Sequence, residues 1–314
     1  MAELVSILIP CHNAAAYVGS AIESASAQTW PKKEIIVVDD GSTDGSGEII
    51  ESYRSRGVKI IHQENKGQCA AANRAFYESD GDYIKFFDAD DLLAPQTVEL
   101  QMQRLAGANS AVASAEWGRF YHDDLSTFRL NRENVWRDMQ AVDWLVEAWM
   151  AARPMMQCAL WLIPRPLLQR SGLWDARLSL INDFEFFARV LCHCEQVFFT
   201  PDARVYYRSG LQGSLSRTRG RKAVESVANS LIWGTGHLLK HRRDKLARRA
   251  CANLFQDFIY SYYPEHGDLR KEMARRVQEL GGSDFEPDGP PQFHLLRSMM
   301  GWRMARRVQR IAGR

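Results

Sequence analysis

The chain has 314 residues, of which 46% are hydrophobic and 25% are charged, an ordinary composition that argues against global disorder. Its longest apolar runs cover only a handful of residues, far below the roughly 20 that span a bilayer. The first residues lack the features of a secretory signal. The six cysteines have no framework spacing, which favours free thiols in a reducing compartment. We therefore expect a cytoplasmic protein.

The formal net charge of +2 conceals an asymmetry between the two halves of the chain. Residues 1–150 contain 13 Lys and Arg against 23 Asp and Glu, a net charge of −10. Residues 151–314 contain 27 against 15, a net charge of +12. An acidic half suits cation binding, whereas a basic half suits phosphate or an anionic membrane surface.

The first ninety residues alternate short β-branched runs with stretches that have helical spacing. Strict alternation of strands and helices predicts a parallel sheet with helices on both faces. We expect strands at 5–9, 34–38, 58–61 and 82–87, and helices at about 14–28, after residue 43, and at 68–77.

The rest of the chain is less regular and becomes helical towards its end. The patterns predict strands at 111–121, 159–163, 197–199 and 204–207, and helices at 140–150, 182–192, 221–239, 245–262 and 269–280. A Gly- and Pro-rich linker at 281–291 precedes the basic tail. We expect one domain over residues 1–215 and a helical C-terminal region over 216–314.

Polar residues follow each of the four N-terminal strands. Because the carboxyl ends of parallel strands share one edge, where ligands of such sheets bind, these residues should form an acidic cleft of nucleotide size. The glycine patterns of dinucleotide-binding and P-loop proteins do not follow the first strand. This edge is therefore not expected to hold phosphate on backbone amides alone. The four segments are 10–13, 39–44, 65–68 and 88–91.

The segment Asp88-Ala89-Asp90-Asp91 carries the sharpest chemical signal. Residues two apart on an extended chain point the same way, so Asp88 and Asp90 can face one ligand. Crowded carboxylates repel each other unless a cation or a proton intervenes, and Mg²⁺ and Mn²⁺ favour oxygen ligands. An acidic turn that caps the following segment is the plain alternative; we favour a metal site.

Asp39, Asp40 and His12 are candidates for nucleoside contacts. An acid after the second strand of a nucleotide-binding sheet accepts hydrogen bonds from the base or the ribose. The flat ring of His12 is suited to stacking on a base. The plain alternatives are a turn anchor for the aspartates and a structural hydrogen bond for the histidine.

Five motifs occur in order within the first ninety-one residues: Pro10-Cys11-His12-Asn13, Asp39-Asp40-Gly41-Ser42-Thr43-Asp44, Asn65-Lys66-Gly67, Asn73 and Phe87-Asp88-Ala89-Asp90-Asp91. Together they resemble the family 2 glycosyltransferases of the GT-A fold, over roughly residues 4–210. The resemblance implies an α/β, Rossmann-like, mostly parallel sheet flanked by helices, with a helical C-terminal extension. It also implies a Mn²⁺ or Mg²⁺ cofactor, and inverting transfer from a nucleotide-diphosphate sugar, most often a UDP-sugar.

The resemblance assigns roles to individual residues. Asp90, with Asp88, would bind the metal, and Asp183 would be the catalytic base. Asn182 stands where the family commonly has glutamate, and Glu185 is a second carboxylate to test. The alternative for Asp183 is a structural role, as an acid at a helix N-terminus that complements the helix dipole. The nucleotide would contact Pro10, His12, Asn13, Asp39, Asp40, Lys66, Gly67, Asp88 and Ala89.

A basic segment follows the last predicted strand. Arg208 and Arg217 are candidates for a loop that closes over the diphosphate, because guanidinium forks match phosphate oxygens. A solvated loop is the alternative. The Gln-x-x-Arg-Trp signature of processive polysaccharide synthases is missing, so we expect single-sugar transfer.

The tail over residues 292–314 contains six arginines and no acid. A basic amphipathic helix can lie in the interface of an anionic membrane. Packing on the protein itself or in a dimer is the alternative, and we expect no nucleic-acid partner because no recognised motif accompanies the charge. On a helical wheel the shared apolar face contains Leu296, Met300, Met304, Val308 and Ile311.

We predict a metal-dependent inverting glycosyltransferase that moves one sugar to a hydroxyl of a glycan or lipid-linked glycan in cell-surface polysaccharide biosynthesis. We expect it in the cytoplasm, at the inner face of the membrane if the tail binds lipid. One alternative is a sugar nucleotidyltransferase, which would carry a glycine-rich phosphate loop where residues 10–13 stand. The other is a non-catalytic scaffold that binds nucleotides or carbohydrates.

Overall fold

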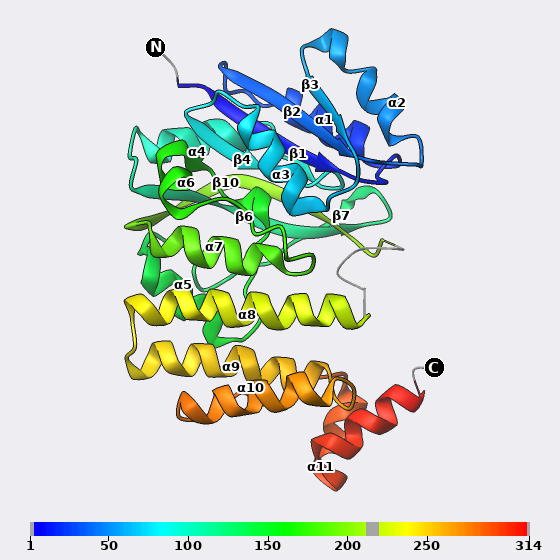
Figure 1. Cartoon of the computed structure of the whole chain (residues 1–314), viewed down its shortest axis with the longest axis vertical. Coiled ribbons are helices and arrows are strands. Elements are labelled where there is room, and N and C mark those ends of the chain that lie inside the picture. Colours follow the sequence, from blue (N-terminus) through cyan, green and yellow to red (C-terminus); the bar gives the residue numbers. More distant parts are fainter. Residues whose placement is uncertain (1–2, 212–219, 313–314) are drawn as a thin grey trace.

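The computed structural model describes residues 3–211 and 220–312. Two β-sheets form one end of the molecule, and a stack of helices extends from them to the C-terminal helix at the far end (Figure 1). The predicted domain boundary at residue 215 lies outside the described residues. Within the described ranges, every helix is too short or too polar to traverse a bilayer. All six cysteines are buried free thiols, as their spacing predicted.

The first sheet has the strand order β3-β2-β1-β4-β9. Strand β1 pairs in parallel with β2 and β4, and β2 pairs in parallel with β3, which confirms the predicted parallel arrangement. Strands β1, β2 and β4 are mostly buried on both faces, as their continuous apolar runs require, whereas the edge strand β3 is partly exposed. The elements are β1 Val5–Cys11, α1 Val18–Ser26, β2 Lys33–Asp40, α2 Ser46–Glu51, β3 Lys59–Gln63, α3 Gln68–Tyr77, β4 Tyr83–Phe86 and β9 Ile163–Pro164.

The second sheet has the order β5-β10-β6-β7, and β8 also pairs with β10. Only β6 and β10 run parallel; the other pairs are antiparallel. The two strands predicted at 197–199 and 204–207 form one long strand with an irregularity between Thr200 and Arg204. The elements are β5 Leu92–Leu93, β6 Ala111–Tyr121, β7 Asp124–Leu130, β8 Met139–Gln140 and β10 Gln196–Ser209.

Three parts of the middle region differ from the prediction. Strand β7 was missed because most of its side chains are exposed and show no alternation. Helix α4 (Thr97–Leu105) was missed because polar Thr97 and Gln101 interrupt its buried apolar face. The strand predicted at 159–163 is instead a 3₁₀ turn, η2 (Cys158–Leu160), followed by the short β9.

A buried polar network closes the seam between the two sheets, which are bridged at Ala113 and Leu162. The Lys85 ammonium donates to Gln101 Oε1 (2.8 Å) and to the Ala159 carbonyl oxygen (2.7 Å). Burial lowers the pKa of Lys85 to about 7. The Gln101 amide in turn donates to the carbonyl oxygens of Ala113 and Leu160. The turn η2 is therefore held at a fixed position beside β4.

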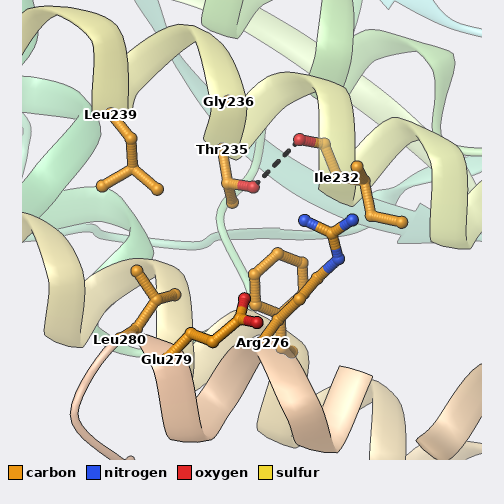
Figure 2. A pocket seen from close by; sticks show the side chains of 8 residues that line it. Ile232, Thr235, Gly236, Leu239, Arg276, Glu279 and Leu280 are labelled. Carbon is orange, nitrogen blue, oxygen red and sulfur yellow. Dashed lines mark hydrogen bonds between the residues drawn. The ribbon is translucent and has the colours of Figure 1, made fainter. Parts of the chain in front are cut away.

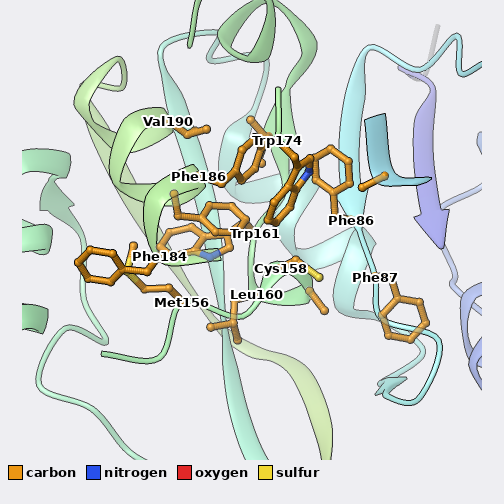
Figure 3. Packing of buried hydrophobic residues seen from close by; sticks show 14 of the residues in the cluster. Phe86, Phe87, Met156, Cys158, Leu160, Trp161, Trp174, Phe184, Phe186 and Val190 are labelled. Atoms are coloured by element: carbon orange, nitrogen blue, oxygen red, sulfur yellow. The ribbon is translucent and has the colours of Figure 1, made fainter. Parts of the chain in front are cut away.

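An aromatic cluster packs helix α7 (Asn182–Cys192) against the sheets (Figure 3). Phe186 stacks on Trp174 at 3.9 Å between ring centroids and meets Phe86 of β4 edge-on at 5.6 Å. Phe187 stacks on Trp161 at 5.2 Å. Since both phenylalanines lie within α7, these contacts fix the position of the helix relative to the end of β4.

Helices α8 to α11 build the C-terminal region below α7 in Figure 1, whereas α5 and α6 precede α7 in the chain. The final helix is not the single straight helix that we predicted: Gly301 has φ +76°, and the chain kinks there. The predicted apolar face therefore does not run along one side of the tail. The elements are α5 Ala141–Met150, α6 Arg165–Ser171, α8 Arg221–His241, α9 Lys245–Ser261, α10 Gly267–Glu279 and α11 Pro291–Ala312.

Helix α8 packs closely on α7 at Gly234, and a substitution there tests this contact. A Cβ atom added at Gly234 of α8 would lie 2.5 Å from the Phe184 ring of α7. We expect Gly234→Ala to lower the free energy of unfolding by about 1–3 kcal/mol, because overpacking outweighs the gain in helix propensity. Urea unfolding measures this change.

Gly236→Ala is the matched control, because no atom lies within 4 Å of a Cβ at that position of the same helix. It should raise the free energy of unfolding by up to about 1 kcal/mol. A gain in stability for both variants would contradict the tight contact between the helices.

Candidate active site

The four polar segments that follow β1, β2, β3 and β4 meet at one edge of the first sheet, as predicted. His12 Nδ1 donates to the Asp40 carbonyl oxygen at 2.9 Å. The Gly67 amide donates to the Asp40 carboxylate at 2.8 Å. Gln68 Nε2 donates to Asp88 Oδ1 at 2.8 Å. These bonds join the ends of all four strands into one continuous rim.

Asp40 shapes the loop after β3. Its carboxylate is 1% exposed and accepts hydrogen bonds from Gln63 Nε2 (2.7 Å) and from the backbone amides of Lys66 (2.9 Å) and Gly67 (2.8 Å). The Gly67 backbone has φ +90°, a conformation that favours glycine. The acid predicted to contact the base thus also holds the loop that would border the nucleotide.

Asp39 is held by a histidine that the sequence did not single out. Its carboxylate accepts from the Ser42 amide (3.1 Å) and from His62 Nδ1 (3.0 Å), and His62 Nε2 contacts Glu51 at 2.6 Å. The bonds to Glu51 and Asp39 raise the pKa of His62. Burial acts to raise the pKa of Asp39, but the hydrogen bonds from Ser42 and His62 prevail and lower it.

The other predicted nucleotide contacts line the same edge. Pro10 borders a small cavity with Asp88. Asn13 has φ +49°, and its side-chain oxygen accepts from the Thr43 amide at 2.8 Å. Ala89 is buried within the acidic turn, and the Lys66 side chain is exposed.

Asp88, Asp90 and Asp91 form a cluster of carboxylates whose oxygen atoms lie within 4.8 Å of one another. Burial raises the pKa of all three, and mutual repulsion raises those of Asp90 and Asp91 further; that of Asp90 reaches about 6. An all-oxygen set of crowded carboxylates is the donor set that Mg²⁺ and Mn²⁺ prefer. The residues therefore fit the divalent cation that the sequence predicted.

Both oxygens of Asp88 already accept hydrogen bonds from side-chain amides. Gln68 Nε2 donates to Oδ1 at 2.8 Å, and Gln157 Nε2 donates to Oδ2 at 3.2 Å. Gln68 lies in the predicted polar segment 65–68, but the sequence assigned it no role. Gln157 was not identified, since a lone glutamine gives no signal without its spatial neighbours.

Both carboxylate oxygens of Asp91 also accept hydrogen bonds, whereas the Asp90 carboxylate is more open. The Arg208 backbone amide donates to Asp91 Oδ1 at 2.8 Å, and Gln157 Nε2 donates to Oδ2 at 2.6 Å. Among residues 3–211 and 220–312, no residue other than Asp90 itself donates a hydrogen bond to the Asp90 carboxylate. Asp90 is thus the member of the cluster most open to a cation.

Asp183 begins α7 beside this cluster. Its backbone amide donates to Asn182 Oδ1 at 2.9 Å, and Asn182 Nδ2 donates to Gln68 Oε1 at 3.2 Å. Burial and the nearby charge of Asp88 raise the pKa of Asp183 well above its ordinary value. The fold therefore brings Asp183 close to Asp88 of the acidic cluster.

Glu185, the second carboxylate of α7, faces the protein interior instead. It is 4% exposed and pairs with Arg189 at 2.8 Å and with His237 at 3.0 Å. Burial acts to raise its pKa, but His237 and Arg189 lower it overall. Glu185 therefore ties α7 to α8 and takes no part in the acidic cluster.

Arg208 is committed to the acidic turn. Its side chain is 1% exposed and lies between the rings of Tyr17 and Phe120, at 4.8 and 4.7 Å from their centroids. Nε donates to the Asp90 carbonyl oxygen at 2.6 Å, and the guanidinium also pairs with Asp123. With its donors directed at protein acceptors, Arg208 anchors the turn. The companion candidate Arg217 lies outside the described residues.

Comparison with known proteins identifies the family. Residues 6–162, half of the chain, match the sequence model of Glycosyl transferase family 2. The chain belongs to this family. Membership confirms the resemblance that the motifs carried, and it sets aside the nucleotidyltransferase alternative.

Curated relatives of this glycosyltransferase match it over part of their length. The putative glycosyltransferase EpsH of Bacillus subtilis is 34% identical over 207 residues, which are 65% of this chain and 57% of that protein. The glycosyltransferase GlyG of Streptococcus pneumoniae is 36% identical over 129 residues, 40% of this chain and 42% of that protein. The chain thus spans about half the length of these relatives.

Solved structures share the fold of this glycosyltransferase almost end to end. Residues 1–349 of S. aureus TarS, in complex with UDP-GlcNAc, superpose with a TM-score of 0.69 at 15% identity, covering 98% of this chain and 92% of that one. The mannosyltransferase PcManGT of Pyrobaculum calidifontis, with GDP-Man and Mn²⁺, gives a TM-score of 0.57 at 16% identity, covering 99% and 88%. These likenesses confirm the predicted GT-A-type α/β fold with its helical C-terminal region.

A second cavity in the described part of the chain lies away from the acidic cluster. A cavity of about 120 Å³ lies between α8, α9 and α10, with mostly apolar walls and the polar side chains of Thr235, Arg276 and Glu279 (Figure 2). The Thr235 hydroxyl donates back to the Ile232 carbonyl oxygen of its own helix at 3.2 Å. This cavity shares no residue with the strand edge that carries the family motifs.

The ion pairs of His62 predict a pH-dependent contribution to stability. Because folding raises the pKa of His62 above its ordinary value of 6.5, this contribution is fully present below about pH 6.5 and is lost as the pH rises through the raised value. We expect His62→Gln to be less stable than wild type at about pH 6, with the difference vanishing towards about pH 9. The side chain is 45% exposed, so solvent screening limits the difference to about 1 kcal/mol.

Urea unfolding of wild type and His62→Gln across this pH range measures the difference in their free energies of unfolding. The titration of the acidic cluster contributes equally to both proteins, so it cancels from this difference. A difference that stayed constant or grew with pH would show that His62 does not carry the charge that links Asp39 to Glu51.

Proposed function

We propose that the chain is a metal-dependent, inverting glycosyltransferase that moves one sugar from a nucleotide-diphosphate donor to a hydroxyl of a glycan or lipid-linked glycan. The observation that carries this proposal is the cluster of Asp88 with Asp90, and the position of Asp183 near Asp88, at the ligand-binding edge of a family 2 fold. The remaining features support the donor, the chemistry and the acceptor in turn.

A UDP-sugar is the donor that we propose. TarS and PcManGT, which share the fold, were solved with UDP-GlcNAc and GDP-Man. In this chain, Asp39, Asp40 and His12 would contact the nucleoside, because they lie together at the ends of β1 and β2. The ring of His12 is exposed and held by its bond to Asp40, which suits it to stacking on the base.

Asp183 would act as the general base. It accepts the proton of the acceptor hydroxyl while that oxygen attacks the anomeric carbon of the sugar. The new C–O bond forms on the face opposite the breaking bond to the diphosphate, so the anomeric configuration inverts. Burial and the charge of Asp88 raise the pKa of Asp183, and a raised pKa makes its carboxylate a stronger base.

Asp90 would hold the Mn²⁺ or Mg²⁺ ion, with Asp88 beside it. When bound, the cation supplies charge neutralisation for the departing nucleoside diphosphate. The open carboxylate of Asp90 supports this assignment.

A lipid-linked acceptor at the inner face of a membrane fits the surface of α11. Leu295, Met299 and Met304 are 64%, 73% and 48% exposed, and Arg303 and Arg307 are exposed between and beyond them. Exposed apolar side chains beside arginines suit the interface of an anionic bilayer. The packing alternative accounts for part of the helix, because Phe293 and Ala305 are buried against the protein.

Asp183→Asn tests the chemistry. Removing the base while keeping the size and polarity of the side chain should lower kcat for sugar transfer about 10²–10⁴-fold. Nucleotide affinity, measured by calorimetry with UDP and Mn²⁺, should not change. Asp175→Asn, the same exchange in a carboxylate that pairs with Arg177 before α7, is the control and should retain activity.

Retained transfer by Asp183→Asn would remove this residue from the base role. A wild-type protein that bound UDP-sugars but neither transferred nor hydrolysed them would support the binding-scaffold alternative instead.

Met299→Asp tests the membrane contact. Burying one methionine side chain in a bilayer interface contributes roughly 1–2 kcal/mol, so the variant should bind vesicles of anionic phospholipid about tenfold more weakly in cosedimentation. Tyr77→Asp, at the equally exposed end of α3 (75% exposed), controls for the added charge. Equal partitioning of the two variants would contradict a membrane role for α11.

A further inference from the structure

Side-chain amides connect the acids of the candidate site across three elements of the fold. Asn182 at the start of α7 donates to Gln68 Oε1 (3.2 Å), and Gln68 at the start of α3 donates to Asp88 (2.8 Å). Gln157, which precedes the turn η2, donates to Asp88 (3.2 Å) and to Asp91 (2.6 Å). The predicted base, the end of β4 and the acidic turn are thus linked by hydrogen bonds through neutral side chains.

The orientation of Gln157 is set by the acids. Its side chain is 6% exposed, and both hydrogens of Nε2 are directed at carboxylate oxygens. Its other polar atom, Oε1, is buried and has no partner within the described ranges. An unpaired buried carbonyl costs about 1–3 kcal/mol. If the side-chain amide were flipped, its carbonyl oxygen would face two carboxylates and be repelled by them. The amide nitrogen therefore stays directed at Asp88 and Asp91, although this leaves Oε1 unpaired and lowers stability.

The backbone that carries Gln157 is held rigidly. The turn η2, which follows it, is fixed by the bonds from Lys85 to the Ala159 carbonyl oxygen and from Gln101 to the Leu160 carbonyl oxygen. Those two residues come from β4 and α4. The amide of Gln157 is therefore presented at a fixed distance from the end of β4, where Asp88 lies.

We propose that Gln157 is a positioning residue of the transfer reaction, and this inference rests on the proposed function. By occupying one oxygen each of Asp88 and Asp91, it limits how far these two carboxylates can turn towards the cation, so that Asp90 is its chief protein ligand. Such cations are usually held by one or two carboxylates and share the remaining positions with substrate phosphates and water. Without Gln157, two further carboxylates would be free to turn towards the cation and take the positions that the diphosphate needs.

The inference is tested by titrating the full chain with Mn²⁺ in the absence of nucleotide, followed by electron paramagnetic resonance. Gln157→Met keeps the volume of the side chain and removes the amide. We expect it to bind Mn²⁺ about tenfold more tightly than wild type, and kcat for UDP-sugar transfer to fall about 10–100-fold, a range typical of residues that orient metal ligands. Asp90→Ala should bind Mn²⁺ more weakly than wild type.

Gln63→Met is the matched control, because Gln63 also donates to a carboxylate of the rim, Asp40 (2.7 Å), outside the acidic cluster. Its Mn²⁺ affinity without nucleotide should equal that of wild type. Should Gln157→Met fail to fold, Gln157→Asn, which keeps an amide on a shorter side chain, is expected to show the same changes in the same titration at a smaller size.

Unchanged Mn²⁺ affinity in the folded Gln157 variant, even with a lowered melting temperature, would overturn the positioning role and leave the proposed function standing. Wild type that binds no Mn²⁺, with or without UDP, would overturn the metal dependence of the proposed function and this inference with it.

Discussion

The structure depends on how it tolerates carboxylates crowded at one edge of a parallel sheet. Carboxylate oxygens of Asp88, Asp90 and Asp91 lie within 4.8 Å of one another, and the charge of Asp88 raises the pKa of Asp183. Burial makes each charge more costly, and proximity adds repulsion. Two features offset this cost: amide donors that occupy Asp88 and Asp91, and one carboxylate left open to a cation. An arrangement so unfavourable for folding persists where it serves a ligand.

The rest of the fold holds these acids in register. Lys85 and Gln101 are polar residues in the centre of the protein, and each is satisfied by carbonyl oxygens at the seam between the sheets. Buried polar groups of this kind specify one arrangement, since any other would leave them unpaired. The stacking of Phe186 on Trp174 likewise fixes the position of α7, through the close fit of the two rings. Hydrogen bonds fix the turn η2, which follows Gln157, and aromatic packing fixes helix α7, which carries the proposed base.

The charge asymmetry of the chain follows the division of the molecule. The acidic half forms the sheet edge with its carboxylates, and the basic half includes the helical region and the tail. Many of its arginines pair with acids on their own surface, as Arg221 does with Asp268. The kink at Gly301 splits α11 into two short helical segments, so its exposed methionines and arginines are presented by a bent element. The charge that would face an anionic surface is therefore smaller than the sequence count suggests.

The alternation of strands and helices over the first ninety residues can be read from the chain alone. It predicts the parallel sheet and the edge at which Asp39, Asp40, Asp88 and Asp90 gather. These features follow from local periodicity and from the rule that parallel strands end on one side. The hydrogen-bond partner of each acid, in contrast, depends on contacts that the folded chain creates. His62 and Gln157 show no pattern along the chain. Arg208 was predicted for a diphosphate because guanidinium forks match phosphate oxygens, whereas the partners that it meets, Asp90 and Asp123, are distant in sequence. Strand β7 and helix α4 escaped prediction because the exposed side chains of β7 do not alternate and because polar Thr97 and Gln101 interrupt the apolar face of α4.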